Sequence, residues 1–496
     1  MRIRTVRTAS GSVAIQVVRY QGKRVKLLKH IGSAKNSGEI PLLKQLAREW
    51  INQFSGQESL FREGKENKDT ILGKYKYLGF RYGFIYTAIN QIFNILKLNN
   101  LDGPKSKMFL DFALIRTVEP VSKRESQKLL SSFFGINYDI TDVYRSLARF
   151  SKFKDQIEER LIEFAKKELG FDFNFVLYDI TTLYFETFAS DDFRKNGFSK
   201  DNKIGQPQIL IGLIVNRDGF PLAFAVFEGN KFEGHTLIPT ILGFKKKHQV
   251  RTLTVVADAA MISRKNIKAL KQAKLSYIVG ARLGNMKLSL ISQIGKGLNA
   301  VDGATIRLPT SEGFLICSFS GKRYSKDKHE MEKQLEKAQL VLDGKREAKK
   351  NKFLAKNAKI KYSLNEGLIE KTKLLLGVRG YHTDLNIPDN IAIERYSDLW
   401  NVERAFRISK NDLSMRPIYH FKKETIEAHI LICVVALAVL KFMEIKTKRS
   451  AKNVVDNFKS VTDGRILNTI TGKESYLRSE ISEEIQLLLE KMGLPH

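Results

Sequence analysis

The chain has 496 residues, of which 43% are hydrophobic and 28% charged, a composition typical of a globular protein with several compact regions. Its formal net charge of +31 makes nucleic acid the first candidate partner, although a ribosome-like or merely soluble basic protein would carry a similar charge. Its two cysteines, Cys317 and Cys433, are too few for a disulfide framework or a thiolate metal cluster.

Residues 1–70 are expected to form a small basic β-hairpin followed by a helix. Apolar and polar positions alternate on both sides of a turn at 21–23, and helical periodicity begins near residue 40. The hairpin could face DNA or pack against the rest of the chain. The start of the chain lacks the apolar segment of a secretory signal, so we expect a cytoplasmic protein.

Residues 71–168 are expected to form a mainly helical DNA-binding region, because apolar residues recur there with a helical period. Helices are predicted near 76–96, 106–117, 122–133 and 140–168.

The third of these helices has a capping pattern and a basic character. Ser122 is a candidate N-cap, and Glu125 stands three residues later, as in a capping box. Three cations lie on the helix: Lys123, Arg124 and Lys128. They would suit a DNA-reading helix-turn-helix, but a solvated basic helix would have the same composition.

A change to apolar and β-branched residues at Phe171 marks a predicted α/β core, formed by 169–284 and 391–445. Five strands are predicted, with helices before the fourth and fifth: 171–186, 208–216, 220–227, 253–257 and 277–280. This order predicts a ribonuclease-H-like mixed five-stranded sheet flanked by helices, in which the first and fourth strands are neighbours. Asp179 is expected at the far end of the first strand and Asp258 directly after the fourth. The sheet would bring them together, although either aspartate alone could be a turn residue or a helix cap.

The segment 396–410 is predicted to form one helix with an unusual polar stripe. At about 100° per residue, five side chains share this stripe: Tyr396, Trp400, Glu403, Arg407 and Lys410. It is not a core face, because buried charges are costly unless they are paired or bound to metal. A carboxylate beside cations and aromatic rings suits a metal ion next to a phosphodiester, with a ring available for base stacking. The alternative is a solvated helix with an ion pair between Glu403 and Arg407.

Three acids therefore come from two neighbouring strands and one helix: Asp179, Asp258 and Glu403. Such a set can hold a pair of divalent ions, and hard oxygen ligands favour Mg²⁺ or Mn²⁺ over zinc. Two such ions support an in-line phosphoryl displacement without a covalent intermediate on the protein.

Other polar residues near these strands are weaker candidates. Glu186, Glu233 and His235 could add a fourth metal contact or serve as turn and cap residues. Lys200 and Asp201 lie in a loop, GFSKDNK, that could approach the substrate.

Residues 285–390 are predicted to be an α+β insertion of strands and basic helices. Between Gly321 and Ile360 there are thirteen Lys or Arg against six Asp or Glu. This part could clamp a DNA backbone or form a solvated helix hairpin.

The apolar run Ile430–Leu440 is about half the length of a membrane span, so we expect a buried helix there. His429 beside it is expected to be a core histidine rather than a ligand. Residues 446–496 are predicted to form a C-terminal helical region that could be a dimer contact or a lid.

Several segments resemble the DDE transposases of bacterial insertion sequences. These are LYDITTLYFE, GFSKDNK, PQILIGLIVNRDGFPLAFAVFEGNKFEGHT, VVADAAMIS and SMRPIYHFKKETIEAHI, so the resemblance covers about 170–290 and 390–445. Tyr396, Glu403 and Lys410 match the spacing Y-x2-R-x3-E-x6-K of the superfamily with the YREK signature, the "insertion sequence four" group. Its arginine is replaced here by Leu399.

The resemblance implies that Asp179, Asp258 and Glu403 bind two Mg²⁺ or Mn²⁺ ions. It also implies that Tyr396 and Lys410 contact phosphates near the cleaved end and that Trp400 stacks on an extruded base. Because Leu399 cannot contact a phosphate through a charge, Arg395 or Arg407 could supply the missing cation.

We therefore expect a transposase that cleaves the ends of an insertion sequence and transfers the freed 3′ hydroxyl into target DNA. The resemblance implies double-stranded DNA as partner, both as terminal inverted repeats and as target. It further implies a homodimer on DNA, no membrane, and a nucleoid-associated location in the bacterial cytoplasm. A ribonuclease-H-like nuclease without strand transfer and a domesticated, non-catalytic DNA-binding protein are the alternatives.

Overall fold

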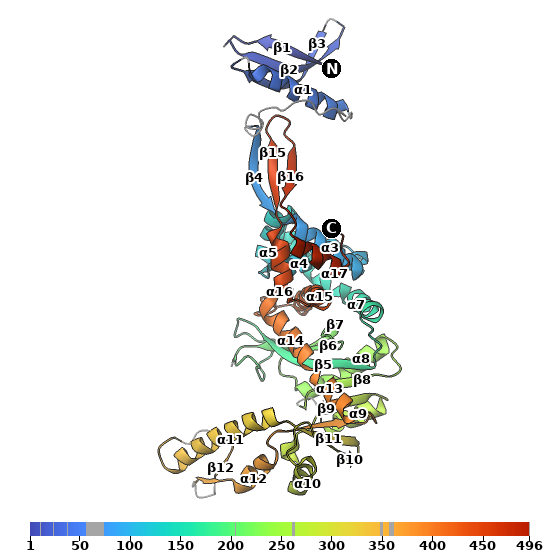
Figure 1. Cartoon of the computed structure of the whole chain (residues 1–496), viewed down its shortest axis with the longest axis vertical. Helices are drawn as coiled ribbons and strands as arrows, with labels where there is room; N and C mark the ends of the chain where they lie inside the picture. Colours follow the sequence, from blue (N-terminus) through green and yellow to red (C-terminus); the bar gives the residue numbers. More distant parts are fainter. Residues whose placement is uncertain are drawn as a thin grey trace. The chain divides into compact units, whose positions relative to one another are not determined.

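The computed structural model describes residues 1–495 except 10, 23, 37, 56–73, 204, 260–262, 348–350 and 357–361. The chain divides into two compact units. Unit 1 comprises Met1–Tyr86, Ser132–Gly135 and Asp456–Gln486, and unit 2 comprises Thr87–Ser131, Ile136–Val455 and Leu487–His496. We describe each unit by itself (Figure 1).

Unit 1 begins with a three-stranded antiparallel sheet packed on one helix. Its elements are β1 (Arg2–Arg7), β2 (Val13–Gln21), β3 (Arg24–Ala34) and α1 (Glu39–Ser55). Ile15 and Val17 of the sheet are buried against Leu43 and Ala47 of the helix. The hairpin and helix predicted here are present as β2, β3 and α1, and β1 adds a third strand.

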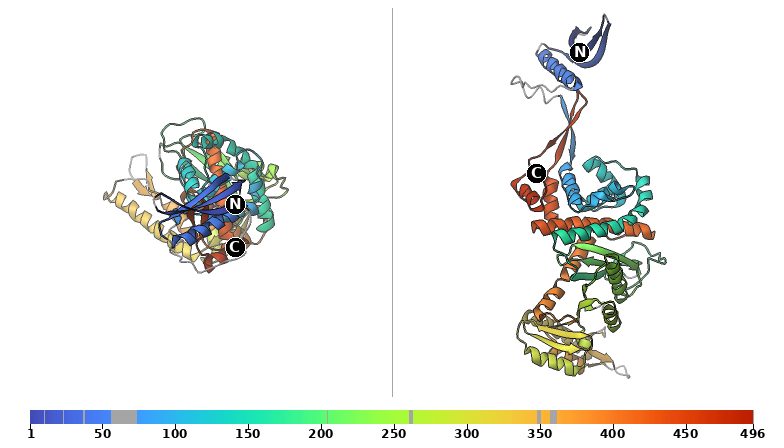
Figure 2. Two further views of the ribbon diagram at one scale, coloured as in Figure 1. Left: turned by 90° about the horizontal axis from the view of Figure 1, so that it is seen from above. Right: turned by 90° about the vertical axis from the view of Figure 1, so that its right-hand side faces the viewer.

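The second sheet of unit 1 joins segments far apart in the sequence. β4 (Tyr75–Arg81) pairs with β15 (Asp463–Asn468), which also pairs with β16 (Glu474–Arg478). Figure 2 shows β4 in blue alongside the two red strands. The helix predicted from residue 76 and the wholly helical end of the chain are therefore wrong in these parts. Aromatic residues such as Tyr75 and Tyr77 favour a strand once a distant partner strand is available.

Unit 2 contains a helical layer built around the long helix α15 (Lys423–Thr447). Around it lie α4 (Ser106–Val118), α6 (Ile140–Phe150) and α7 (Lys154–Glu168), all in contact with α15. In the described part of the chain, α15 is the helix long and apolar enough to cross a membrane. However, 94% of its apolar segment is buried inside the protein. The prediction of a buried helix around 430–440 is confirmed.

The large sheet of unit 2 has eight strands in the order β10-β11-β14-β9-β8-β5-β6-β7. Its strands are β5 (Phe175–Tyr184), β6 (Gln208–Val215), β7 (Pro221–Glu228), β8 (Thr254–Ala257), β9 (Ser276–Gly280), β10 (Thr305–Thr310), β11 (Gly313–Phe319) and β14 (Val378–Thr383). β5, β8 and β9 are parallel to one another, and the other neighbouring pairs are antiparallel. The first and fourth predicted strands are neighbours, as expected, but the prediction of a five-stranded sheet is wrong. Three strands of the predicted insertion extend the same sheet.

The rest of the predicted insertion packs beside those three strands. It contains α10 (Leu288–Leu298), α11 (Gly321–Leu342), α12 (Glu366–Leu374) and the short pair β12 (Leu354–Lys356) and β13 (Tyr362–Leu364). Met331 and Ala338 of α11 are buried with Phe353, Ile369 and Leu376. The basic run after α11 lies partly outside the described residues.

The remaining elements are mostly short. The helices are α3 (Gly83–Ile95), α5 (Lys123–Leu129), α8 (Leu237–Lys247), α9 (Arg264–Gln272), α13 (Asp389–Ser397), α14 (Trp400–Arg407), α16 (Ala451–Ser460) and α17 (Glu483–Met492). Single turns of 3-10 or π-helix are η1 (Leu98–Asn100), η2 (Leu130–Phe134), η3 (Ser151–Phe153), η4 (Glu233–His235), η6 (Leu283–Asn285) and η7 (Ile408–Asp412).

Candidate active site

Asp179 lies in the middle of β5, not at its far end as predicted. The parallel pairing of β5 with β8 stops at Tyr178 and Ala257, whereas the antiparallel pairing with β6 continues to Tyr184. Asp179 and Asp258 are thus the residues that directly follow the last parallel pair on two neighbouring strands. The expectation that these two acids come together at one edge of the β5-β8 pairing agrees with this register.

The carboxyl group of Asp179 is partly buried, and its pKa is raised to about 6. Burial is the main cause, because removal from water disfavours the charged form. The carboxylates of Glu403 and Glu233 raise this pKa further, whereas the charge of Lys200 and the backbone N–H of Ile180 lower it. The excess of negative charge around Asp179 would favour a bound cation.

Asp258 is exposed and is held by a tyrosine on a neighbouring helix. The hydroxyl of Tyr396 donates a hydrogen bond to Oδ1 of Asp258 at 3.1 Å. Its ring packs edge-on against Tyr381, with 4.8 Å between the ring centroids. Burial and the charge of Asp258 raise the pKa of Tyr396, so its hydroxyl keeps its proton and remains a donor. A side chain at Gly280 would have its Cβ 2.5 Å from this hydroxyl, so a glycine is required there.

The predicted helix 396–410 is wrong as a single element, because it is divided into three parts. Tyr396 belongs to α13, Glu403 to α14 and Lys410 to the π-helical turn η7, with a break at Asp398 and Leu399. Both residues at the break have right-handed helical φ and ψ angles, so the chain keeps nearly the same direction.

Glu403 is exposed on α14, which packs against β5 and β6. Among the described residues, Glu403 and Arg407 form no ion pair, so the alternative of a paired, solvated helix lacks its main contact. Trp400 is 52% exposed, and the guanidinium of Arg404 lies 5.6 Å from its ring centroid. Leu399 is only 7% exposed, so the residue in place of the signature arginine packs in the core.

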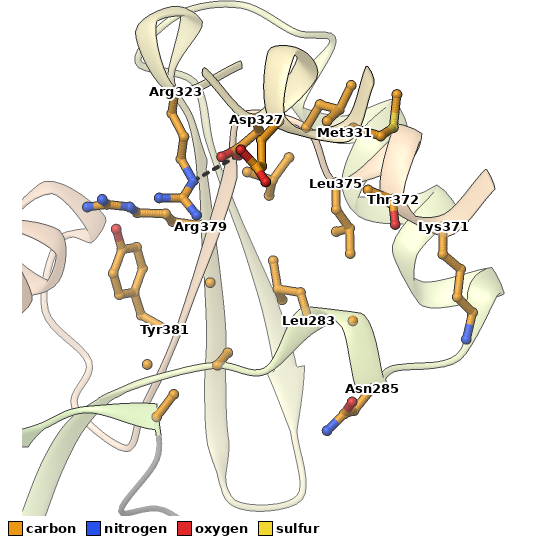
Figure 3. Close-up of a pocket in the computed structure, with 18 of the residues that line it drawn as sticks. Leu283, Asn285, Arg323, Asp327, Met331, Lys371, Thr372, Leu375, Arg379 and Tyr381 are labelled. Atoms are coloured by element: carbon orange, nitrogen blue, oxygen red, sulfur yellow. Dashed lines mark ion pairs between the residues drawn. The ribbon is translucent and has the colours of Figure 1, made fainter. Parts of the chain in front are cut away.

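A cavity of about 1370 Å³ begins at these residues and continues into the insertion. Asp258, Tyr396, Trp400 and Glu403 line one end. Figure 3 shows the rest: Arg323, paired with Asp327 at 3.1 Å, stands above apolar walls formed by Leu283, Met331 and Leu375, and Lys371 lies at a far edge. Charged and polar side chains therefore line the cavity at Asp258 and Glu403 and again at Arg323 and Lys371.

Asp179 does not line this cavity. Within the described parts of the chain, no group of three or more His, Cys, Asp or Glu side chains is close enough to form a metal site. The acids instead relate in pairs: Asp179 with Asp258 through the strand register, and Asp179 with Glu403 through their electrostatic interaction. The donors are all carboxylate oxygens, the type that suits Mg²⁺ or Mn²⁺.

Lys410 is mostly buried and has a carboxylate partner. Its Nζ lies 3.3 Å from Oδ2 of Asp201, which also pairs with Arg416. Burial lowers the pKa of Lys410, and Asp201 opposes this shift. Asp201 was named in the sequence as part of a loop that could approach the substrate, but its link to Lys410 spans too many residues to be predicted. Arg407 is exposed.

The predicted DNA-reading helix is present as α5, but one of its three cations is misplaced. The hydroxyl of Ser122 accepts a hydrogen bond from the backbone N–H of Glu125 at 3.2 Å, which confirms the N-cap. Lys123 is only 5% exposed, and its Nζ lies 3.3 Å from Nδ1 of His429. The prediction that Lys123 binds DNA is therefore wrong, because it points into the core formed with α15. Arg124 and Lys128 are exposed, and Lys128 pairs with Glu125 at 3.0 Å.

The weaker candidates lie around the site without joining it. Glu233 forms an ion pair with Lys200 at 3.0 Å. Glu186 is exposed and accepts a hydrogen bond from Gln206 at 3.3 Å. The ring of His235 packs against Phe232. His429 is 5% exposed, which confirms that it is a core histidine.

Residues 171–439 match the family described as "Transposase DDE domain". This match covers more than half of the chain. The chain belongs to the DDE transposase family. The matched range includes Asp179, Asp258 and Glu403.

Comparison with solved structures gives only distant likenesses to transposases. A piggyBac transposase synaptic complex with hairpin DNA is 12% identical, with a TM-score of 0.36, over 83% of this chain and 75% of that chain. A Mos1 transposase paired-end complex with the left transposon end is 11% identical, with a TM-score of 0.16, over 47% of this chain and 66% of that chain. The Mos1 strand transfer complex is 12% identical, with the same TM-score and coverage. No curated protein matches the chain. Family membership therefore rests on the matched domain.

Proposed function

We propose that this DDE transposase cleaves phosphodiester bonds at the ends of an insertion sequence and transfers the freed 3′ hydroxyls into target DNA. The observation that supports the proposal is the register of β5 and β8, in which Asp179 and Asp258 directly follow the last parallel pair, together with the packing of α14, the helix of Glu403, against β5. We further propose that β5 to β9 are a ribonuclease-H-like core and that the chain belongs to the group with the YREK signature.

Asp179, Asp258 and Glu403 would hold two Mg²⁺ or Mn²⁺ ions. The excess of negative charge around Asp179 and the all-oxygen donor set fit such ions. When bound, the ions would activate the attacking oxygen and stabilise the leaving one. The hydroxyl of Tyr396 orients the carboxylate of Asp258 through its hydrogen bond, and Gly280 leaves room for that contact.

The side chains around the acids would hold the DNA. The exposed ring of Trp400 provides a face on which an unpaired base can stack. Tyr396, Arg407 and Lys410 would contact phosphates near the cleaved bond. Arg124 and Lys128, exposed on α5, would contact the duplex elsewhere.

The partners would be terminal inverted repeats and target DNA, bound by a homodimer in the cytoplasm at the nucleoid. The net charge of +31 favours such polyanionic partners. With many phosphates neutralised, binding should weaken steeply as salt concentration rises.

The test uses the full chain, a labelled duplex that carries the inverted repeats flanking the gene, and a supercoiled plasmid as target. With Mg²⁺ we expect cleavage at the repeat and covalent joining of labelled ends to the plasmid, both abolished by a chelator. Cleavage without joining would instead indicate a nuclease. Binding without cleavage would indicate a domesticated DNA-binding protein.

A further inference from the structure

A short loop between β5 and β6, residues 197–203, is fixed to the strand that carries Asp179. The backbone N–H of Lys200 donates to Oγ1 of Thr182 at 3.2 Å. Within the loop, Oγ of Ser199 accepts hydrogen bonds from the N–H groups of Asp201 and Lys203, at 3.3 Å and 3.2 Å. The backbone around Asp201 is thus fixed by several local hydrogen bonds.

The carboxylate of Asp201 holds two cations at once. Its Oδ2 lies 3.3 Å from Nζ of Lys410, and its Oδ1 pairs with the guanidinium of Arg416. The side chains of Lys410, Asp201 and Arg416 are 10%, 14% and 25% exposed. Water screens charges weakly at such sites, so the two cations would repel each other strongly without the carboxylate between them.

Both cations are linked to the elements that carry two of the proposed catalytic acids. Lys410 belongs to η7, which follows directly after α14 and Glu403. Arg416 lies with its guanidinium 6.0 Å from the ring centroid of Tyr184, at the end of β5. Nearby, the backbone N–H of Ile418 donates to the carbonyl oxygen of Tyr184 at 3.3 Å. The loop therefore links the strand of one acid to the segment that follows another.

The neighbouring residue of the loop points to the other side. Nζ of Lys200 donates to the carbonyl oxygen of Ile180 at 2.6 Å and pairs with Glu233 at 3.0 Å. Lys200 therefore contributes positive charge next to Asp179, whereas Asp201 faces Lys410 and Arg416. Lys200 thus interacts with Asp179 and Glu233, and Asp201 interacts with Lys410 and Arg416.

We propose that Asp201 is a positioning residue that holds Lys410 and Arg416 side by side, so that a DNA phosphate beside the cleaved bond meets a fixed pair of cations. This inference rests on the proposed function. Cations that are already fixed in place lower the activation free energy, because their side chains need not be ordered when the phosphate reacts. Asp201 itself is negative and repels phosphate, so its role is to position the two cations and not to bind the DNA.

This role predicts opposite effects on binding and on cleavage. Asp201→Asn removes a negative charge, so affinity for the duplex should stay the same or rise. The cations would no longer be held together, so single-turnover cleavage should fall about tenfold or more. Asp201→Glu keeps the charge but moves it by one methylene, so its cleavage rate should lie between those of the unaltered protein and Asp201→Asn. A merely structural residue would lower the melting temperature and the affinity together.

A double-mutant cycle assigns the effect to Lys410. In a Lys410→Met background, Asp201→Asn should slow cleavage by a smaller factor than in the parent protein, because one of the two cations that it positions is absent. Asp191→Asn is the matched control: it lies in the same connection between β5 and β6 and pairs with Arg194 at 2.7 Å, away from Lys410. This control should cleave within about twofold of the parent protein.

Three results would overturn the inference. They are normal cleavage by a folded Asp201→Asn protein, an equal loss in the presence and absence of Lys410, and a loss of affinity that matches the loss of cleavage. Should Asp201→Asn fail to fold, the Asp201→Glu protein decides, since it is expected to slow cleavage while keeping affinity. If the unaltered protein fails to cleave the duplex, the proposed function fails first, which is a distinguishable outcome.

Discussion

Two groups of cations in unit 2 lie at the same segment of chain, residues 410–416, and differ in their partners. The paired cations, Lys410 and Arg416, share the carboxylate of Asp201. The core cations, Arg116 and Lys123, have a carbonyl oxygen and a histidine ring as partners instead. Lys410 and Arg416 belong to the stretch 410–416, which follows the helix of Glu403, and Arg116 donates a hydrogen bond to a carbonyl oxygen in it.

The core cations are sealed from solvent by α15. Nη1 of Arg116 donates to the carbonyl oxygen of Leu413 at 3.4 Å, and Nε2 of His429 lies 3.0 Å from the carbonyl oxygen of Met415. A carbonyl can only accept, so Nε2 carries the proton and Nδ1 accepts from Lys123. Burial lowers the pKa of Lys123 well below its ordinary value.

The comparison shows what decides whether a cation serves a site. Lys410 and Lys123 are both mostly buried, but their partners differ in kind. An ion pair that is partly exposed to solvent can be rearranged when a phosphate arrives. A cation bonded to a core histidine has no path to DNA. We therefore expect changes at the paired cations to slow cleavage and changes at the core cations to leave cleavage nearly unchanged.

The largest expected effect lies at the acids. Asp179→Asn, Asp258→Asn and Glu403→Gln should each reduce cleavage at least about 1000-fold while retaining DNA binding, because each removes a carboxylate that we propose to bind metal. A cleavage assay with labelled ends and a gel-shift assay measure the two properties. Glu186→Gln is the control acid and should cleave normally. Full activity in any of the three proteins would remove that residue from the site.

The next effect separates the two groups of cations. Lys410→Met should slow cleavage about 10- to 100-fold. Lys123→Met should leave cleavage within about threefold, and it should not lower the free energy of unfolding by more than about 1 kcal/mol, because a buried cation without a carboxylate is costly. Cleavage rates and chemical denaturation test the pair. Equal loss of cleavage in both proteins would erase the distinction drawn between the groups.

A smaller effect is expected at Trp400. Because its side chain is 52% exposed, Trp400→Ala should leave the melting temperature almost unchanged. Loss of base stacking should slow processing of the ends about tenfold and slow the first nick less. Separate quantification of nicked and processed products tests this. A large drop in melting temperature, or equal slowing of both steps, would point to a packing role instead.

The smallest effect concerns acid stability and arises at the core cations. Burial, with the charges of Lys123 and Arg116, lowers the pKa of His420 to about 4 and that of His429 well below its ordinary value. Below about pH 6.5, His420 and His429 therefore bind protons in the unfolded chain but not in the folded chain. The free energy of unfolding has its full value above that pH and should fall by about 1–3 kcal/mol as the pH drops towards 4.

Thermal unfolding between pH 7 and pH 4 measures this loss. The slope should be shallower for His420→Gln, with His329→Gln, at an exposed histidine on α11, as the control. An unchanged slope in His420→Gln would show that other groups cause the acid sensitivity.

The sequence was sufficient for the parts of the site that depend on local pattern. Alternating and helical periods placed the strands around Asp179 and Asp258, and the capping box located the start of α5 at Ser122. The order of elements was enough to predict that β5 and β8 are neighbours.

Features that depend on distant partners could not be predicted in this way. β4 becomes a strand because β15, almost four hundred residues later, pairs with it. The sequence predicts Asp179 at a strand end because the longer pairing of β5 with β6 cannot be seen from one segment. Lys123 is predicted on the surface because a helical period does not say which side of α5 meets α15.

The central claim is that three acids distant in sequence share divalent ions, and iron substitution tests it most directly. Fe²⁺ in place of Mg²⁺, with ascorbate and peroxide, produces radicals that cut the backbone next to the bound ion. In the full protein bound to DNA we predict cuts near Asp179, Asp258 and Glu403 together, all lost in Asp179→Asn. Cuts confined to another part of the chain, or a pattern unchanged in Asp179→Asn, would contradict the account.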